Sequence, residues 1–359
     1  MKILSIIHRY YPAVGGTETH MGTIHRMLVE RGHTVTVLTT DAKDFELFWN
    51  RDRDRFANLA DEHDGVKILR FPVRHLPLPH YSFPAGRLLT SQIAKLFPHT
   101  SLSKKMTSYF PHVPVMSDWL ETTQEQFDVV VGTTITLEGI LQVGQQFAQR
   151  KHIPFVIVPL THLGGGARPA SEPISRFYTL PQQQQIVLSA DGLLAINPAE
   201  QAYYAGHGMA KEKMALAPSA PNVEELKGGD GDRWRVEHDV DADTFLVVVL
   251  SALTRDKGTI QTIEAMRQLW RNGSKAKLVL AGSPRSDFET HLTTIPAAEN
   301  QQMILRGRVS NNERKDLLAA ADVFCMPSAV ESFGIAFAEA MVFKAGDRGQ
   351  CVGGEGLCD

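Results

Sequence analysis

An alternation of short β-branched runs with segments of helical periodicity constrains the fold of this chain more than any other feature of its sequence. Residues 2–7 form a β-branched run, glycines interrupt the chain at 15–16, and apolar residues then recur at helical spacing until Gly32. Residues 34–39 supply a second strand. The chain therefore opens as a βαβ unit, with a glycine loop at the carboxyl end of its first strand.

The alternation restarts after a glycine and aspartate cluster at 228–232, and 359 residues suffice for two domains that each bury a core. We therefore predict an α/β protein with two Rossmann-like domains, residues 1–227 and 228–359. The expected strands of the first domain are 2–7, 34–39, 66–71, 129–131, 155–159 and 193–196, and those of the second are 245–250, 277–281, 303–305 and 322–326.

Two stretches depart from the alternation. Prolines punctuate the sequence between Pro72 and Asp118, where we expect an insertion of loops with at most two helical pieces. After Met341, residues 342–359 are rich in glycine and resemble out-of-frame or foreign sequence. We expect the second domain to be incomplete, with no strand after its last helix, and to be less stable than the first.

Composition restricts the function classes. Lys and Arg number 37 against 40 Asp and Glu, so the net charge of -3 gives no global case for nucleic acid binding. Three cysteines form neither a disulfide framework nor a zinc-ligand pattern. No uninterrupted run of about 18 apolar residues and no export signal occurs, so we expect a cytoplasmic protein.

Gly15 and Gly16 lie between the first strand and the first helix, where glycine amides and a helix amino end can face a phosphate. The loop is neither G-x-G-x-x-G nor a P-loop, so the sequence predicts no nicotinamide cofactor and no ATP. A tight turn without any ligand explains the two glycines equally well.

Glu331 and Glu339 lie eight positions apart after the strand at 322–326, and Glu339 is the only polar residue between Ile335 and Phe343. A carboxylate on such an apolar helix is costly to bury without hydrogen-bond donors. Hydroxyl groups of a ligand are candidate donors. The alternative is that Glu339 bonds to backbone or to solvent.

The segment ESFGIAFAEAM resembles the E-x7-E motif of the retaining GT-B glycosyltransferases of family 4. HRYYPAVGGTETH, THLGGG, SALTRDKG and RGRVSNNERKDLLAAADVFCMPSAVESFG support the resemblance, which covers most of residues 1–341. It implies two Rossmann-like domains facing across a cleft, a nucleotide-diphosphate sugar as donor, a glycan or lipid as acceptor, retention of configuration, and no metal or cofactor requirement.

The resemblance also implies roles for the matching residues of the second domain. Glu331 and the backbone around Phe333 and Gly334 would hold the transferred sugar, and Glu339 would accept hydrogen bonds from the ribose. Lys257 would face the diphosphate. A lysine, helix amino ends and glycine amides can stabilise the negative charge that builds up on a departing nucleoside diphosphate.

In the first domain, the resemblance places Gly15 and Gly16 near the transferred sugar and the phosphates, and His162 near the donor sugar. An ordinary loop histidine is the alternative for His162. The chain departs from the family pattern at Ala252, where an arginine usually pairs with the lysine on the phosphates. Arg255 is the nearest substitute.

Residues 65–117 contain no acidic residue, and Leu88, Leu89, Ile93 and Leu96 recur there at near-helical spacing. The excess of basic over acidic residues in this stretch suggests a surface for an anionic acceptor or a peripheral contact with an anionic membrane. The alternative is a basic, solvated insertion. The basic residues of the stretch are Lys67, Arg70, Arg74, Arg87, Lys95, Lys104 and Lys105.

Two other functions compete with sugar transfer. One is a non-catalytic relative that at most binds nucleotide, which donor binding without turnover would favour. The other is an NAD-dependent dehydrogenase, which lacks both the glycine fingerprint and the acidic residue expected after the second strand.

Overall fold

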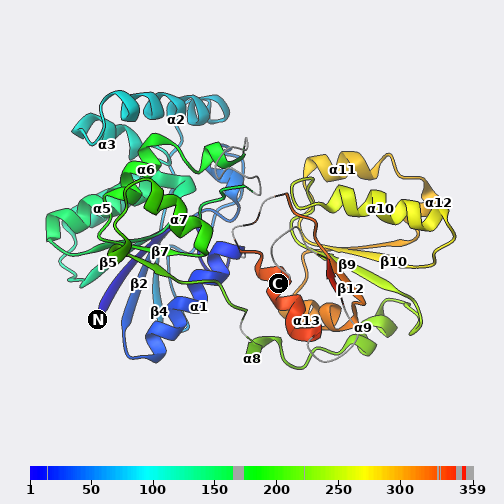
Figure 1. Ribbon diagram of the computed structural model, residues 1–359. Helices are drawn as coiled ribbons and strands as arrows, with labels where there is room; N and C mark the ends of the chain where they lie inside the picture. The colour runs from blue at the N-terminus through cyan, green and yellow to red at the C-terminus, as the bar shows by residue number, and fades with distance from the viewer. Residues whose placement is uncertain are drawn as a thin grey trace. The chain divides into compact units, whose positions relative to one another are not determined.

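The computed structural model describes residues 1–13, 15–164, 174–221, 223–329, 331, 333–344 and 350–352. The last glycines of THLGGG, Ser332 and most of the 342–359 tail lie outside these residues. The chain divides into two compact units, residues 1–219 and 220–359, whereas the sequence placed the boundary between 227 and 228 (Figure 1).

The first unit is built on an eight-stranded sheet in the order β3-β4-β2-β1-β5-β6-β7-β8, in which β3 alone is antiparallel to its neighbour. The six predicted strands are confirmed, and the short edge strands β3 and β8 were missed. In chain order the strands are β1 (Lys2–Ile7), β2 (Thr34–Thr40), β3 (Ala60–His63), β4 (Val66–Phe71), β5 (Val129–Thr133), β6 (Phe155–Val158), β7 (Gly192–Ala195) and β8 (Met214–Leu216).

The helices of the first unit include three that begin between residues 72 and 118, so the expectation of at most two helical pieces there is wrong. Proline at the start of α2 and of α4, and the Thr100 side chain that caps α3, provide the local signals for these starts. The α-helices are α1 (Gly16–Glu30), α2 (Pro79–Leu96), α3 (Ser101–Thr107), α4 (Pro114–Thr122), α5 (Glu138–Lys151), α6 (Pro181–Leu188) and α7 (Pro198–Gly206).

The second unit is built on a parallel sheet in the order β11-β10-β9-β12-β13. The chain moves outward from β9 to β11 and then returns to the other side of β9 as β12, which creates a topological switch point between β9 and β12. The strands are β9 (Leu246–Leu250), β10 (Lys277–Ala281), β11 (Met303–Gly307), β12 (Val323–Cys325) and β13 (Gln350–Val352).

Helices cover both faces of this second sheet. Val248 of β9 belongs to an apolar cluster with Leu317 and Phe337, whereas the adjacent Val247 belongs to another with Ile263 and Phe288. This alternation explains the continuous apolar run of a parallel strand. The helices are α8 (Val223–Leu226), α9 (Gly231–Glu237), α10 (Thr259–Arg271), α11 (Ser286–Leu292), α12 (Ala297–Asn300), α13 (Asn311–Ala320) and α14 (Ile335–Lys344).

The strand β13 corrects the expectation that no strand follows the last helix. Residues 350–352 pair in parallel with β12, in register with Val323, Phe324 and Cys325, and α14 forms the crossover between the two strands. Three residues that begin with Gln and Cys carry too little β-branched character for a pattern-based prediction. Their pairing depends on β12, which a local sequence pattern does not reveal.

Candidate functional site

The switch point of the second unit brings together two residues that lie 74 positions apart in the sequence. The Lys257 Nζ atom lies 2.5 Å from Glu331 Oε1 and donates a hydrogen bond to it. Lys257 belongs to the loop after β9, and Glu331 belongs to the loop after β12. Ligands of open α/β sheets bind outside the carboxyl ends of the strands at such a point.

Backbone contacts hold these two loops against each other. The Asp256 carbonyl accepts hydrogen bonds from the Ala329 amide at 2.9 Å and from Ser328 Oγ at 3.2 Å. Gly258 has a φ of 75°, and a Cβ atom at this position would overlap the Pro327 carbonyl. A glycine is therefore needed at 258 for both backbone conformation and space, which explains its place directly after Lys257.

The second glycine of this site is Gly334, whose φ is 78°. It is buried immediately before α14, and its position lies near the Glu331 side chain and the Phe337 ring. Phe333 is half-buried beside it. The sequence-predicted residues Glu331, Phe333, Gly334 and Lys257 therefore gather at one edge of the sheet.

Glu339 lies buried in α14 and pairs with an arginine, a partner that neither sequence-based alternative included. Arg314 of α13 donates from Nη1 to Glu339 Oε1 at 2.5 Å. The Glu339 side chain is 8% exposed and that of Arg314 is 22% exposed. Sequence reasoning missed Arg314, because two residues that lie on different helices and 25 positions apart leave no local signal.

Arg255, the substitute expected for the arginine missing at Ala252, is exposed. Its backbone amide donates to Asp287 Oδ2 at 2.8 Å, which ties the loop after β9 to the start of α11. Ala252 is also exposed. The structure thus places Arg255 in the same loop as Lys257, and it describes no contact of the Arg255 side chain with the Lys257 and Glu331 pair.

In the first unit, the glycine loop packs against an ion pair that the sequence did not predict. Arg9 Nη2 lies 2.6 Å from Glu18 Oε1, and the Glu18 side chain is 4% exposed. A Cβ atom at Gly15 would overlap the Glu18 carboxylate, whereas one at Gly16 would meet nothing within 4 Å. His8 is also buried here, and burial, together with the nearby Arg9, lowers its pKa well below the usual value.

His162 follows β6, and its half-buried ring packs against Tyr178, with ring centroids 4.6 Å apart. The loop that carries it is fixed by Glu200 of α7, which accepts hydrogen bonds from the Thr161 amide at 2.6 Å and the Ile196 amide at 2.9 Å. Burial raises the pKa of Glu200 despite these bonds. Glu200 is therefore a positioning residue that the sequence analysis missed.

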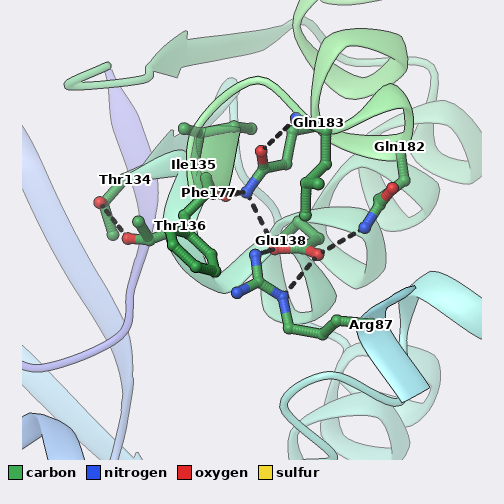
Figure 2. Close-up of polar contacts among 9 residues, drawn as sticks. Arg87, Thr134, Ile135, Thr136, Glu138, Phe177, Gln182 and Gln183 are labelled. Atoms are coloured by element: carbon green, nitrogen blue, oxygen red, sulfur yellow. Dashed lines mark hydrogen bonds and ion pairs between the residues drawn. The ribbon is translucent and has the colours of Figure 1, made fainter. Parts of the chain in front are cut away.

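Another buried carboxylate, Glu138, lies after β5 at the amino end of α5. Its two oxygens accept a bidentate pair of hydrogen bonds from Arg87 Nε at 3.1 Å and Nη2 at 2.8 Å. Figure 2 shows Gln182 and Gln183 of α6 directed at the same carboxylate, with hydrogen bonds of 3.0 and 3.3 Å. This network joins α2, α5 and α6, and it leaves Glu138 with no capacity for a ligand.

Comparison with known proteins identifies the family. Residues 15–220 match the profile of the glycosyl transferase 4-like domain, and residues 230–345 match that of glycosyl transferases group 1. The chain belongs to the group 1, family 4-like glycosyltransferases. Both matched segments contain candidate site residues predicted from the sequence, Gly15, Gly16 and His162 in the first and Lys257, Glu331 and Glu339 in the second.

Solved structures show that this family member has the GT-B fold. HepE of Anabaena, in complex with UDP and glucose, is 17% identical with a TM-score of 0.62, and the match covers 96% of this chain and 78% of HepE. Sucrose-phosphate synthase of Thermosynechococcus elongatus is 18% identical with a TM-score of 0.65, covering 98% of this chain and 80% of that protein.

Among curated proteins, the alpha-maltose-1-phosphate synthase of Mycobacterium tuberculosis is similar to this glycosyltransferase family member. The two are 26% identical over 192 residues, which cover 48% of this chain and 46% of the relative. The match thus spans about half the length of the curated relative.

Within the described part of the chain, no group of three or more His, Cys, Asp or Glu side chains is arranged to hold a metal ion.

Proposed function

We propose that this protein transfers a sugar from a nucleotide-diphosphate sugar to a glycan or lipid acceptor with retention of configuration. The observation that carries the proposal is the Lys257 and Glu331 ion pair at the switch point of the second unit. Membership of the glycosyltransferase family supports it, as does the similarity to HepE, whose crystal structure is a complex with UDP and glucose.

Lys257 would stabilise the departing nucleoside diphosphate. Cleavage of the bond between sugar and phosphate builds negative charge on the phosphate, and a preorganised cation favours that charge. An ammonium group has three N–H donors, and Glu331 accepts one of them, so donors remain for phosphate oxygens. Arg255, in the same loop, is the second candidate cation of the proposal.

Glu331 would bind the transferred sugar together with the backbone around Phe333 and Gly334. A carboxylate held in place by a lysine accepts hydrogen bonds from sugar hydroxyls without reorganising, which favours a fixed orientation of the donor. Glu339 would accept hydrogen bonds from the ribose hydroxyls. The bond from Arg314 would hold the Glu339 carboxylate in a fixed orientation for this contact.

We assign the acceptor side of the reaction to the first unit, with His162 near the donor sugar and Gly15 and Gly16 near the sugar and phosphates. The proposed reaction requires no metal and no cofactor. We further propose that the protein acts in the cytoplasm, in peripheral contact with the inner face of the membrane.

A donor panel tests the proposal. Purified protein is incubated with UDP-, GDP- and ADP-sugars, release of nucleoside diphosphate is measured, and the anomeric configuration of the product is determined by NMR. We expect release from one base class and a product that retains the anomeric configuration of the donor. Binding of a donor without any release would instead favour a non-catalytic relative. The alanine at position 252, where the family usually has an arginine on the phosphates, would be a physical reason for such a loss of activity.

A further inference from the structure

The helix α2 has its apolar and polar faces reversed relative to an ordinary surface helix. Leu88, Leu89 and Leu96 are 63%, 54% and 69% exposed, whereas Thr90 and Ser91 are buried. A solvated helix normally buries its leucines and exposes its hydroxyl groups. In Figure 1, α2 lies at the periphery of the first unit.

The polar network around Glu138 fixes this orientation. Arg87 points inward from α2 to the bidentate contact with Glu138 (Figure 2). Gly86 faces the Phe110 ring so closely that a Cβ atom would overlap it. Since consecutive helix residues are separated by about 100°, anchoring residues 86 and 87 inward directs Leu88 and Leu89 away from the core. The Gln185 side chain adds a hydrogen bond to the Ala94 carbonyl at 2.7 Å.

The exposed apolar side chains continue beyond α2. Tyr81, 76% exposed, begins the stripe, and Phe97 and Leu102 extend it into the start of α3. In a helix, Tyr81, Leu88, Leu89 and Leu96 fall within less than half a turn of one another, so they share one face. We define the α2–α3 surface as Tyr81, Leu88, Leu89, Leu96, Phe97 and Leu102.

Among the described residues, the unpaired charges beside this surface are positive, although fewer basic side chains contribute to them than the seven named from the sequence. Lys67 pairs with Glu125, Arg70 is buried and pairs with Asp61, and the half-buried Arg87 pairs with Glu138. These three of the seven basic residues named from the sequence are therefore neutralised by carboxylates. Lys95 and Lys105 are exposed, and no ion pair found among the described residues involves them.

We propose that the α2–α3 surface binds the interface of an anionic lipid bilayer, with the leucines among the acyl chains and Lys95 and Lys105 at the headgroups. An exposed apolar stripe flanked by lysines and aromatic residues is suited to this role. The 18 residues of α2 would lie flat over about 27 Å. None of the described helices is long and apolar enough to cross a bilayer.

Charge favours a bilayer over a second copy of the chain as the occupant. A two-fold interface would place this surface against itself, and residues 65–117 contain no acidic residue to receive the lysines. An anionic bilayer supplies the missing negative charge together with an apolar interior. The proposal does not depend on the sugar transfer proposed for the second unit.

Cosedimentation of the full chain with vesicles tests the proposal. We expect the protein to bind phosphatidylcholine vesicles that contain phosphatidylglycerol and not to bind vesicles of phosphatidylcholine alone. Leu88→Gln with Leu89→Gln should lower the partition coefficient at least about tenfold, because two apolar side chains no longer leave water. Lys95→Gln and Lys105→Gln should each lower it about fivefold at low salt.

The matched control is Leu269→Gln with Lys275→Gln, an exposed leucine and lysine of the second unit, which should bind vesicles as the parent does. Circular dichroism verifies that each variant is folded. Failure of the folded parent to bind anionic vesicles would overturn the proposal, as would leucine variants that bind like the parent. A dimer that the leucine substitutions dissociate, without vesicle binding, would assign the surface to a second copy instead.

Discussion

At the residue scale, Arg314 is the cation that accompanies the burial of Glu339. The carboxylate is buried on an apolar helix, and the guanidinium supplies the charge that such a position requires. We predict that Arg314→Met lowers the free energy of unfolding by about 3 kcal/mol, because it leaves a buried carboxylate without this cation. Urea denaturation measures this change.

The double variant Arg314→Met with Glu339→Gln is the control for that prediction. A neutral amide beside the apolar methionine no longer needs a cation, so much of the lost stability should return. If the single and the double variant are equally unstable, the ion pair does not account for the burial of Glu339.

Substitutions of the two glutamates of the E-x7-E motif should affect different steps of the reaction. We predict that Glu339→Ala raises the donor Kd more than Glu331→Ala does, whereas Glu331→Ala chiefly lowers the transfer rate. A ribose contact acts equally on bound donor and transition state, but a contact to the reacting sugar can strengthen in the transition state. Titration calorimetry and single-turnover kinetics measure the two effects, and wild-type behaviour of both variants would remove the assignment.

Gly15 and Gly16 provide a matched pair of substitutions. Gly15→Ala must displace the ion pair of Arg9 and Glu18, so we expect a loss of about 1–3 kcal/mol in stability. Gly16→Ala meets open space at the first position of α1 and should leave stability unchanged. Thermal denaturation of both variants checks this contrast, and equal melting temperatures would contradict it.

Residues predicted from the sequence and residues that were missed differ in a physical way. Lys257, Glu331 and Gly334 were singled out because they lie in segments that resemble the motifs of family 4 glycosyltransferases, and their roles remain predictions. Arg314 and Glu18 were missed because their importance arises from a partner on another element. Pattern reasoning detects periodicity and loop position, and it does not detect such long-range pairs.

At the scale of elements, α1 should make the first unit sensitive to acid. Burial lowers the pKa of His20 to about 4 and, with the nearby His20, that of His25 to about 3, from an ordinary value of 6.5. The unfolded chain therefore takes up protons between pH 6.5 and about 3 that the folded chain does not. Stability is complete above about pH 6.5 and falls as the pH falls through that window.

Replacing one histidine tests this origin of the pH dependence. In the window from pH 6.5 to about 4, His20→Gln should reduce the slope of unfolding free energy against pH by up to about 1.4 kcal/mol per pH unit. Urea denaturation at several pH values measures the slope. A slope that is the same in wild type and variant would assign the acid sensitivity to other groups.

The helix α2 was predicted from the sequence, but the direction in which its apolar side faces was not. The near-helical spacing of Leu88, Leu89 and Leu96 correctly indicated a helix. Periodicity defines one apolar stripe but does not say whether that stripe faces the core or the outside. The Arg87 contact with Glu138 determines the orientation, and these two residues are 51 positions apart.

At the scale of the whole molecule, two α/β units with separate cores follow from two rounds of strand and helix alternation. The predicted strands were recognised because each has an apolar run of its own. The strands β3, β8 and β13 were not predicted, since none has a β-branched run of its own and each pairs with a single neighbour at an edge of its sheet. Short edge strands depend on tertiary context more than on intrinsic propensity.

We propose that the second unit carries a donor site in which Lys257 stabilises the leaving diphosphate. The most direct test is the rate of nucleoside diphosphate release, from the donor that the panel identifies, by wild type and by Lys257→Ala. We predict a loss of at least about 100-fold in kcat for Lys257→Ala, the scale expected when one preorganised electrostatic contact to the transition state is removed. Release at the wild-type rate by a folded Lys257→Ala variant would contradict this role of Lys257.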